Sequence, residues 1–184
     1  NHHVIGEARP ISVTFPDGSE ASVTEVYASD RRLDLAVLRV DKKGLPALPL
    51  GDSDSLADGA EVVVIGNPQG LDLSVVDGVL SGRRDIEGQS MLQLAVPIES
   101  GNSGGPVLDR RGNVHGLVNM KSAVTANLGF AIEVNDLKKL LERPNPIPMT
   151  RWLTIGALSE DNWTNVFAGD WRQRAGRILV NNRG

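Results

Sequence analysis

The stretch ESGNSGGPVL, residues 99–108, raises the question on which the fold assignment depends. Ser103 stands among glycines, which let the backbone turn sharply. It is either an ordinary turn residue or a nucleophile. A serine hydroxyl is a weak nucleophile at neutral pH, so the second interpretation requires a base that accepts its proton and a group that orients the base. The rest of the chain has to supply both.

Most of the chain is predicted to form short strands separated by turns. The expected strands are residues 11–15, 21–28, 33–40, 61–66, 74–82, 91–96, 106–108, 114–120 and 129–132. The Asp-Gly pair in PDGSE, residues 16–20, is typical of a hairpin. This spacing favours an all-β sandwich or barrel over βαβ units. One helix is predicted at residues 135–143, with Asn135 or Asp136 as its N-cap.

The composition excludes several classes of function. The 184 residues carry a net charge of -4 and no block of Lys or Arg, so nothing points to a nucleic-acid partner. No cysteine is present, which excludes zinc-thiolate and redox chemistry. No apolar run approaches the roughly 18 residues that a membrane span needs.

The position of the histidines indicates which type of serine site is present. The sequence GNSGG matches the nucleophile elbow of α/β-hydrolases, but that site needs a helix after the serine and a later histidine. Gly- and Pro-rich sequence follows Ser103 instead, and His115 lies in a predicted strand. The remaining histidines, His2 and His3, precede the serine. They fit the order His, Asp, Ser that is found in chymotrypsin.

Five segments in order resemble the HtrA-type trypsin-like serine proteases. They are NHHVI (1–5), LDLAVLRV (33–40), LPLGDSDSLADGAEVVVIGNPQGL (48–71), GNSGGPV (101–107) and GFAI (129–132). The resemblance covers about residues 1–142. It implies a chymotrypsin-like double β-barrel with a short C-terminal helix. The first barrel is expected to be incomplete, because the family's strands that precede the histidine are not in this sequence, which we interpret as N-terminally truncated.

The resemblance also implies a domain division and a set of catalytic residues. Residues 1–70 would be the remainder of the first barrel, 71–142 the second barrel with its helix, 143–150 a proline-rich linker and 151–184 an unassigned tail. His3 would be the general base, Asp34 the acid that orients it and Ser103 the nucleophile. The N–H groups of Gly101 and Ser103 would form the oxyanion hole. A carboxylate in an apolar strand needs a partner, and a histidine N–H supplies one.

The substrate pocket implied by the family pattern is apolar. Ile98, Leu117 and Val118 would line it, and Pro97 stands where trypsin has its aspartate. We therefore expect cleavage after small or medium aliphatic residues. We expect no cofactor and no metal, since neighbours on an extended segment such as His2 and His3 point to opposite faces and no third ligand is evident. His115 is predicted to have no special role.

The sequence therefore predicts a serine endopeptidase that acts on polypeptides, in particular unfolded or misfolded ones. The resemblance further implies a homotrimer and an extracytoplasmic location. Two alternatives stay open: a non-catalytic, protease-like module that binds unfolded polypeptide, and an esterase with the same triad.

Overall fold

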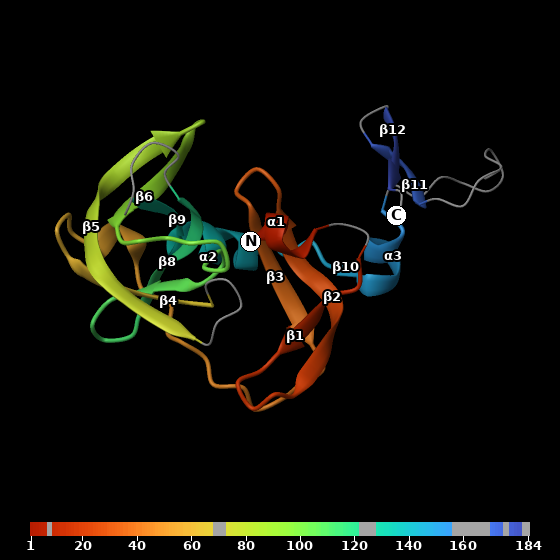
Figure 1. The fold of residues 1–184 in the computed structure, drawn as a ribbon, viewed down its shortest axis with the longest axis horizontal. Helices are drawn as coiled ribbons and strands as arrows, with labels where there is room; N and C mark the ends of the chain where they lie inside the picture. The colour runs from red at the N-terminus through yellow and green to blue at the C-terminus, as the bar shows by residue number, and fades with distance from the viewer. Residues whose placement is uncertain (7–8, 68–72, 122–127, 156–169, 175–176, 182–184) are drawn as a thin grey trace.

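The computed structural model describes residues 1–6, 9–67, 73–121, 128–155, 170–174 and 177–181. Its larger body is a closed barrel of antiparallel neighbours in the order β4-β5-β6-β9-β8-β7 (Figure 1). The strands are β4 (Glu61–Gly66), β5 (Ser74–Ile86), β6 (Gln89–Ala95), β7 (Pro106–Leu108), β8 (Val114–Lys121) and β9 (Gly129–Glu133). Apolar residues that alternate along these strands face one another inside the barrel.

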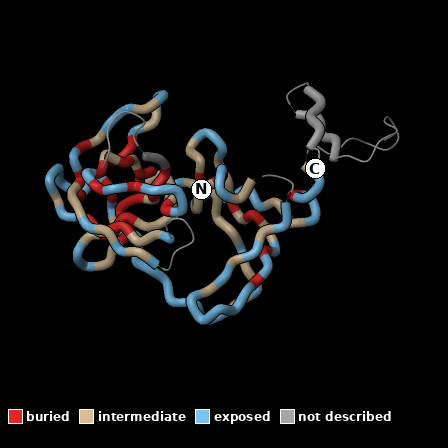
Figure 2. The backbone as a smooth tube through the Cα atoms, viewed as in Figure 1, coloured by how far each residue is buried: buried red, intermediate tan, exposed pale blue. Residues whose placement is uncertain are grey.

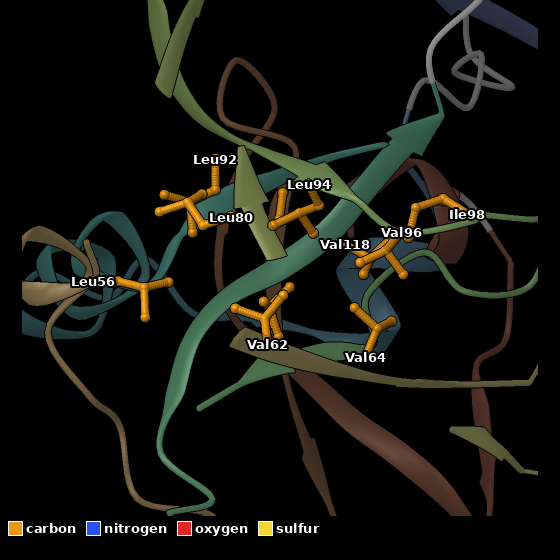
Figure 3. Close-up of a cluster of buried hydrophobic side chains, with 11 residues drawn as sticks. Leu56, Val62, Val64, Leu80, Leu92, Leu94, Val96, Ile98 and Val118 are labelled. Carbon is orange, nitrogen blue, oxygen red and sulfur yellow. The ribbon is translucent and has the colours of Figure 1, made fainter. Parts of the chain in front are cut away.

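Valine and leucine side chains fill the barrel (Figure 3). The cluster consists of Leu56, Val62, Val64, Leu80, Leu92, Leu94, Val96, Ile98, Val107, Val118 and Ala131. Burying each such side chain contributes about 1.5–3 kcal/mol relative to leaving it exposed. Figure 2 shows buried residues concentrated in this half of the molecule. The barrel is therefore the rigid support for the loop that carries Ser103.

The other half is an open sheet. Its strands are β1 (Ser12–Thr14), β2 (Glu20–Asp30), β3 (Leu35–Val40) and β10 (Ile147–Pro148). Strand β2 pairs with all three others. The predicted hairpin between β1 and β2 is confirmed, with Gly18 at φ 77 in its turn.

Three α-helices and a 3-10 turn complete the elements of the described residues. They are α1 (His2–Ile5), η1 (Ser53–Ser55), α2 (Val134–Glu142) and α3 (Met149–Leu153), and β11 (Asp170–Arg174) pairs with β12 (Arg177–Asn181). The predicted C-terminal helix is α2, but its predicted cap is wrong. Glu133 occupies the cap position, while the Asn135 amide donates to Asp52 and Asp136 pairs with Lys139.

An apolar cluster joins the sheet to the barrel. Leu35 of β3 packs with Met91 of β6 and Ile132 of β9, and partly buried apolar residues surround them. The predicted all-β architecture with one closed barrel and one incomplete barrel is thus confirmed. None of the helices in the described ranges is long and apolar enough to cross a membrane.

Candidate active site

Asp34 lies in the turn between β2 and β3, at the point where that turn reaches the barrel. Asp30 shapes the turn, because its Oδ1 accepts the N–H groups of Arg32 at 2.8 Å and Leu33 at 3.0 Å. Asp34 itself has φ 54, a left-handed conformation that aspartate tolerates better than most residues. The prediction that Asp34 lies within a strand is therefore wrong, since β3 begins one residue later.

The carboxylate of Asp34 holds His3 by two contacts. Oδ1 accepts the backbone N–H of His3 at 2.8 Å, and Oδ2 lies 2.5 Å from the ring Nδ1. A carboxylate accepts hydrogen bonds, so Nδ1 carries the proton and the basic nitrogen is Nε2. The His3 side chain is 52% exposed and that of Asp34 22%. The structure thus brings two of the three predicted triad residues together, with about half of the His3 side chain exposed.

Ser103 lies in a tight loop that the barrel holds from both sides. The N–H of Asn102 donates to the carbonyl of Glu99 at 3.1 Å, and that of Gly104 donates to Val118 of β8 at 2.8 Å. Gly101, at φ 104, permits the sharp bend. In the part of the chain that the structure describes, the N–H groups of Gly101 and Ser103 have no hydrogen-bond acceptor. The prediction that these two groups form the oxyanion hole requires such unpaired donors.

The Ser103 hydroxyl does not bond to His3 within the described residues. Its Oγ donates to the backbone carbonyl of Asn119 at 3.1 Å. The side-chain amide of the same residue donates to Asp34 Oδ2 at 2.8 Å. Asn119 therefore contacts both Asp34 and Ser103. Sequence reasoning missed this residue, although a lone amide in the apolar strand VHGLVNMK was a signal.

The three residues predicted to line the substrate pocket lie on different faces of the barrel. The side chains of Ile98 and Val118 are buried in the barrel interior. Leu117, one position along the strand, packs on the opposite face with the cluster around Leu35. The cavity of about 460 Å³ that adjoins the site is lined by His3, Asp34, Asn119 and the turns around Arg32 and Glu87.

His115 lies in β8, as the prediction of a strand residue requires, and it has a structural role that the sequence did not reveal. It is 5% exposed, its Nδ1 lies 2.9 Å from the carbonyl oxygen of Asp52, and its Nε2 lies 3.1 Å from Asp109 Oδ2. Burial would raise the pKa of Asp109. Hydrogen bonds from Asn113, from His115 and from the N–H of Arg111 outweigh that effect and hold the pKa well below its usual range.

His2 and His3 lie in a one-turn helix rather than on the extended segment that was expected. The ring of His2 is buried and meets Trp152 edge-on, with 5.8 Å between ring centroids, whereas His3 faces Asp34. Among the described residues, no group of three or more His, Cys, Asp or Glu could hold a metal ion.

Comparisons with known proteins agree with this geometry. Residues 1–117 match the family described as the trypsin-like peptidase domain. A probable periplasmic serine endoprotease, DegP-like, from Pseudomonas putida is 37% identical over 76% of this chain and 32% of its own length. The magnetosome formation protease MamE from Paramagnetospirillum magneticum is 38% identical over 75% of this chain and 21% of its own length. The chain thus spans about a third or less of these relatives.

Solved structures give the same result. The HtrA-type protease AlgW with a tripeptide superposes with a TM-score of 0.71 at 35% identity, over 77% of this chain and 50% of that one. The serine endoprotease from Yersinia pestis gives 0.70 at 33% identity, over 78% and 51% of the two chains. The chain therefore belongs to the trypsin-like peptidase family and has the fold of the HtrA-type serine proteases.

Proposed function

We propose that this chain carries the catalytic site of a serine endopeptidase, with His3 as base, Asp34 as orienting acid and Ser103 as nucleophile. The observation that carries the proposal is the double contact between Asp34 and His3, with Nδ1 2.5 Å from Oδ2. This contact fixes the tautomer in which Nε2 is basic and stabilises the imidazolium that forms when Nε2 takes a proton.

The reaction then proceeds in two halves. Ser103 Oγ attacks the carbonyl carbon of a peptide bond while its proton passes to His3 Nε2. The N–H groups of Gly101 and Ser103 donate to the oxyanion, and loss of one such donor typically costs about 100- to 1000-fold in rate. The C–N bond breaks as Nε2 returns the proton to the leaving amine. Water, activated by the same nitrogen, then hydrolyses the acyl ester and regenerates the serine.

The first step requires a movement of the Ser103 hydroxyl. In the resting structure this hydroxyl donates to the Asn119 carbonyl. For catalysis it has to leave this acceptor and donate to His3 Nε2, and rotamer changes of exposed side chains take picoseconds to nanoseconds. The resting hydrogen bond is therefore compatible with catalysis.

The substrates are polypeptides, unfolded or misfolded ones in particular, and cleavage follows small or medium aliphatic residues. The names of the relatives include periplasmic endoproteases, which supports an extracytoplasmic location for this protein as well. The homotrimer implied by the resemblance stays a prediction, and light scattering coupled to gel filtration tests it.

A non-catalytic module that binds unfolded polypeptide is the second candidate. The hydrogen bond from Ser103 to Asn119 favours this candidate, because the serine hydroxyl donates to a backbone carbonyl and not to the proposed base His3. Casein digestion distinguishes the two candidates. The endopeptidase cleaves casein and loses this activity in Ser103→Ala, whereas a binding module retains casein without cutting it. A peptide library that shows cleavage after Arg or Asp in preference to Val would contradict the apolar specificity.

A further inference from the structure

Helix α1, which carries His3, is a single turn of four residues. Helices this short are not stable by themselves in water, so contacts with the rest of the protein must hold it. On one side it is tied to the turn before β3. The His2 N–H donates to the Asp34 carbonyl at 3.0 Å, and the His3 N–H donates to Asp34 Oδ1.

The other side of α1 rests on the C-terminal part of the chain. His2 is only 9% exposed, and the indole of Trp152 meets its ring edge-on at an interplanar angle of 65°. Trp152 is 1% exposed, and it has the largest of the fully buried side chains in the described residues. Edge-to-face contacts at this separation are a favoured arrangement of aromatic rings. Trp152 therefore covers His2, the residue directly before His3 in the chain.

The segment that carries Trp152 is anchored on β2, the strand that precedes the turn with Asp34. Asn145 clasps Ser29 of β2, because its Oδ1 accepts the Ser29 N–H at 2.8 Å and its Nδ2 donates to the Ser29 carbonyl at 2.9 Å. Strand β10 then pairs with β2 at Val26, and α3 follows directly. Figure 1 shows β10 and α3 beside β2, on the far side of the sheet from the barrel. Trp152 is thus fixed relative to the strand that leads to Asp34.

We propose that Trp152 is a positioning residue for His3. Successive residues of a helix point about 100° apart, so the direction of the His2 ring sets the direction of its neighbour. While Trp152 holds the His2 ring, α1 cannot rotate about its axis, and the His3 ring stays on Asp34. The inference rests on the proposed function of His3, and it assigns a role in that site to the segment 145–153.

Two substitutions test the proposal at the tryptophan. Trp152→Leu removes the ring, whereas Trp152→Phe keeps an aromatic edge. The indole N–H has no hydrogen-bond partner among the described residues, so the phenylalanine loses no hydrogen bond. Leu80→Ala, deep in the barrel, is the control for a general loss of stability. His2→Ala removes the other half of the contact and serves if Trp152→Leu does not fold.

The first measurement is the NMR signal of the proton between His3 Nδ1 and Asp34, recorded in a Ser103→Ala background so that it does not depend on catalysis. We expect Trp152→Leu and His2→Ala to broaden or lose this signal, while Trp152→Phe and Leu80→Ala keep it. In the active chain, kcat falls at least tenfold in Trp152→Leu and KM changes less than twofold. A retained signal in both Trp152→Leu and His2→Ala overturns the inference, whereas a normal signal pattern without any peptide cleavage overturns the proposed function alone.

Discussion

Asp34 is the residue at which three segments of the chain meet. Its carboxylate accepts hydrogen bonds from His3 of α1 and from Asn119 of β8, and its carbonyl accepts the N–H of His2. Each of these groups is a donor, so an ionised carboxylate satisfies all of them. A side chain that itself carries an N–H donor, such as asparagine, would place this donor against the N–H groups of His3 or Asn119 and lose a hydrogen bond.

We predict that Asp34→Asn lowers kcat/KM by about 10⁴-fold without unfolding the protein. The amide that replaces the carboxylate would donate toward His3 and favour the tautomer in which Nε2 carries the proton, and a comparable change in another serine protease costs about that factor. Asp41→Asn, on an exposed loop, is the control. Activity of Asp34→Asn within tenfold of the unchanged protein contradicts the orienting role of this residue.

Asn119 gives a second prediction at this scale. Asn119→Leu removes the amide that donates to Asp34 at 2.8 Å but keeps the backbone carbonyl. A hydrogen bond to a charged group contributes about 1.5–3 kcal/mol, so we expect activity to fall about 10- to 100-fold. Asn119→Ser, which retains a donor, should recover part of this loss. Equal activities of the leucine and serine variants would show that the amide does not act on Asp34.

Among the elements, strands β4 and β7 approach each other so closely that Gly105, directly before β7, has no room for a side chain. A Cβ added at Gly105 would lie 2.3 Å from the carbonyl oxygen of Ile65, a distance that real Cβ atoms do not adopt. We predict that Gly105→Ala lowers Tm by more than 10 °C, since relief of the contact must separate two barrel strands. At Gly18 an added Cβ would meet open space, and the only penalty is the positive φ. Gly18→Ala should therefore lower the free energy of unfolding by about 1–2 kcal/mol. Similar melting temperatures for the two variants would contradict this account.

Asp109, in the loop between β7 and β8, is expected to make the stability of the fold depend on pH. The pKa of Asp109 is lowered in the folded state, so its contribution to stability is present above the ordinary carboxyl pKa of about 3.9 and is lost as pH falls. We expect the free energy of unfolding, measured in urea between pH 5 and 2, to decrease more steeply in the unchanged protein than in Asp109→Asn. Parallel curves would exclude Asp109 as a source of acid sensitivity.

The strands could be predicted where their pattern is simple. Residues 61–66 and 106–108 agree with β4 and β7, because runs of apolar residues end at glycine or polar residues. Strand β5 continues to Ile86, past the predicted end at Gly82. Gly82 lies at a shift in the pairing with β6 rather than at a strand end. A glycine that marks a bulge and a glycine that marks a turn look the same in sequence.

The candidate site could be predicted as far as its motifs extend. His3, Asp34 and Ser103 each lie in a short sequence motif, namely NHHVI, LDLAVLRV and GNSGGPV. Asn119 and Trp152 do not, because their contacts join residues far apart in the chain. The amide of Asn119 meets Asp34 across 85 residues, and no local pattern reports such a pairing.

At the scale of the whole molecule, the site exists only while the open sheet and the barrel are docked. His3 and Asp34 come from the sheet half, whereas Ser103 and Asn119 come from the barrel. Leu35, next to Asp34, is 2% exposed and packs against Met91 and Ile132 of the barrel. The position of the open sheet relative to the barrel therefore depends on this apolar contact.

We predict that Leu35→Ala impairs catalysis more than its effect on stability explains. Removal of a buried leucine costs about 2–5 kcal/mol of unfolding free energy, and Leu80→Ala inside the barrel should cost a similar amount. Only Leu35→Ala loosens the contact that aligns Asp34 with the barrel, so its kcat/KM should fall at least tenfold below that of Leu80→Ala. Equal activities in the two variants, measured well below their melting temperatures, would contradict this dependence on docking.

Labelling with a fluorophosphonate, a reagent that reacts with activated serines, tests most directly whether Ser103 is a nucleophile. We predict that the chain is labelled on Ser103, that Ser103→Ala abolishes the label, and that His3→Ala slows labelling by about 10⁴-fold or more. A folded chain that is not labelled, or one that is labelled equally after Ser103→Ala, would contradict the assignment of Ser103 as the nucleophile of a serine peptidase.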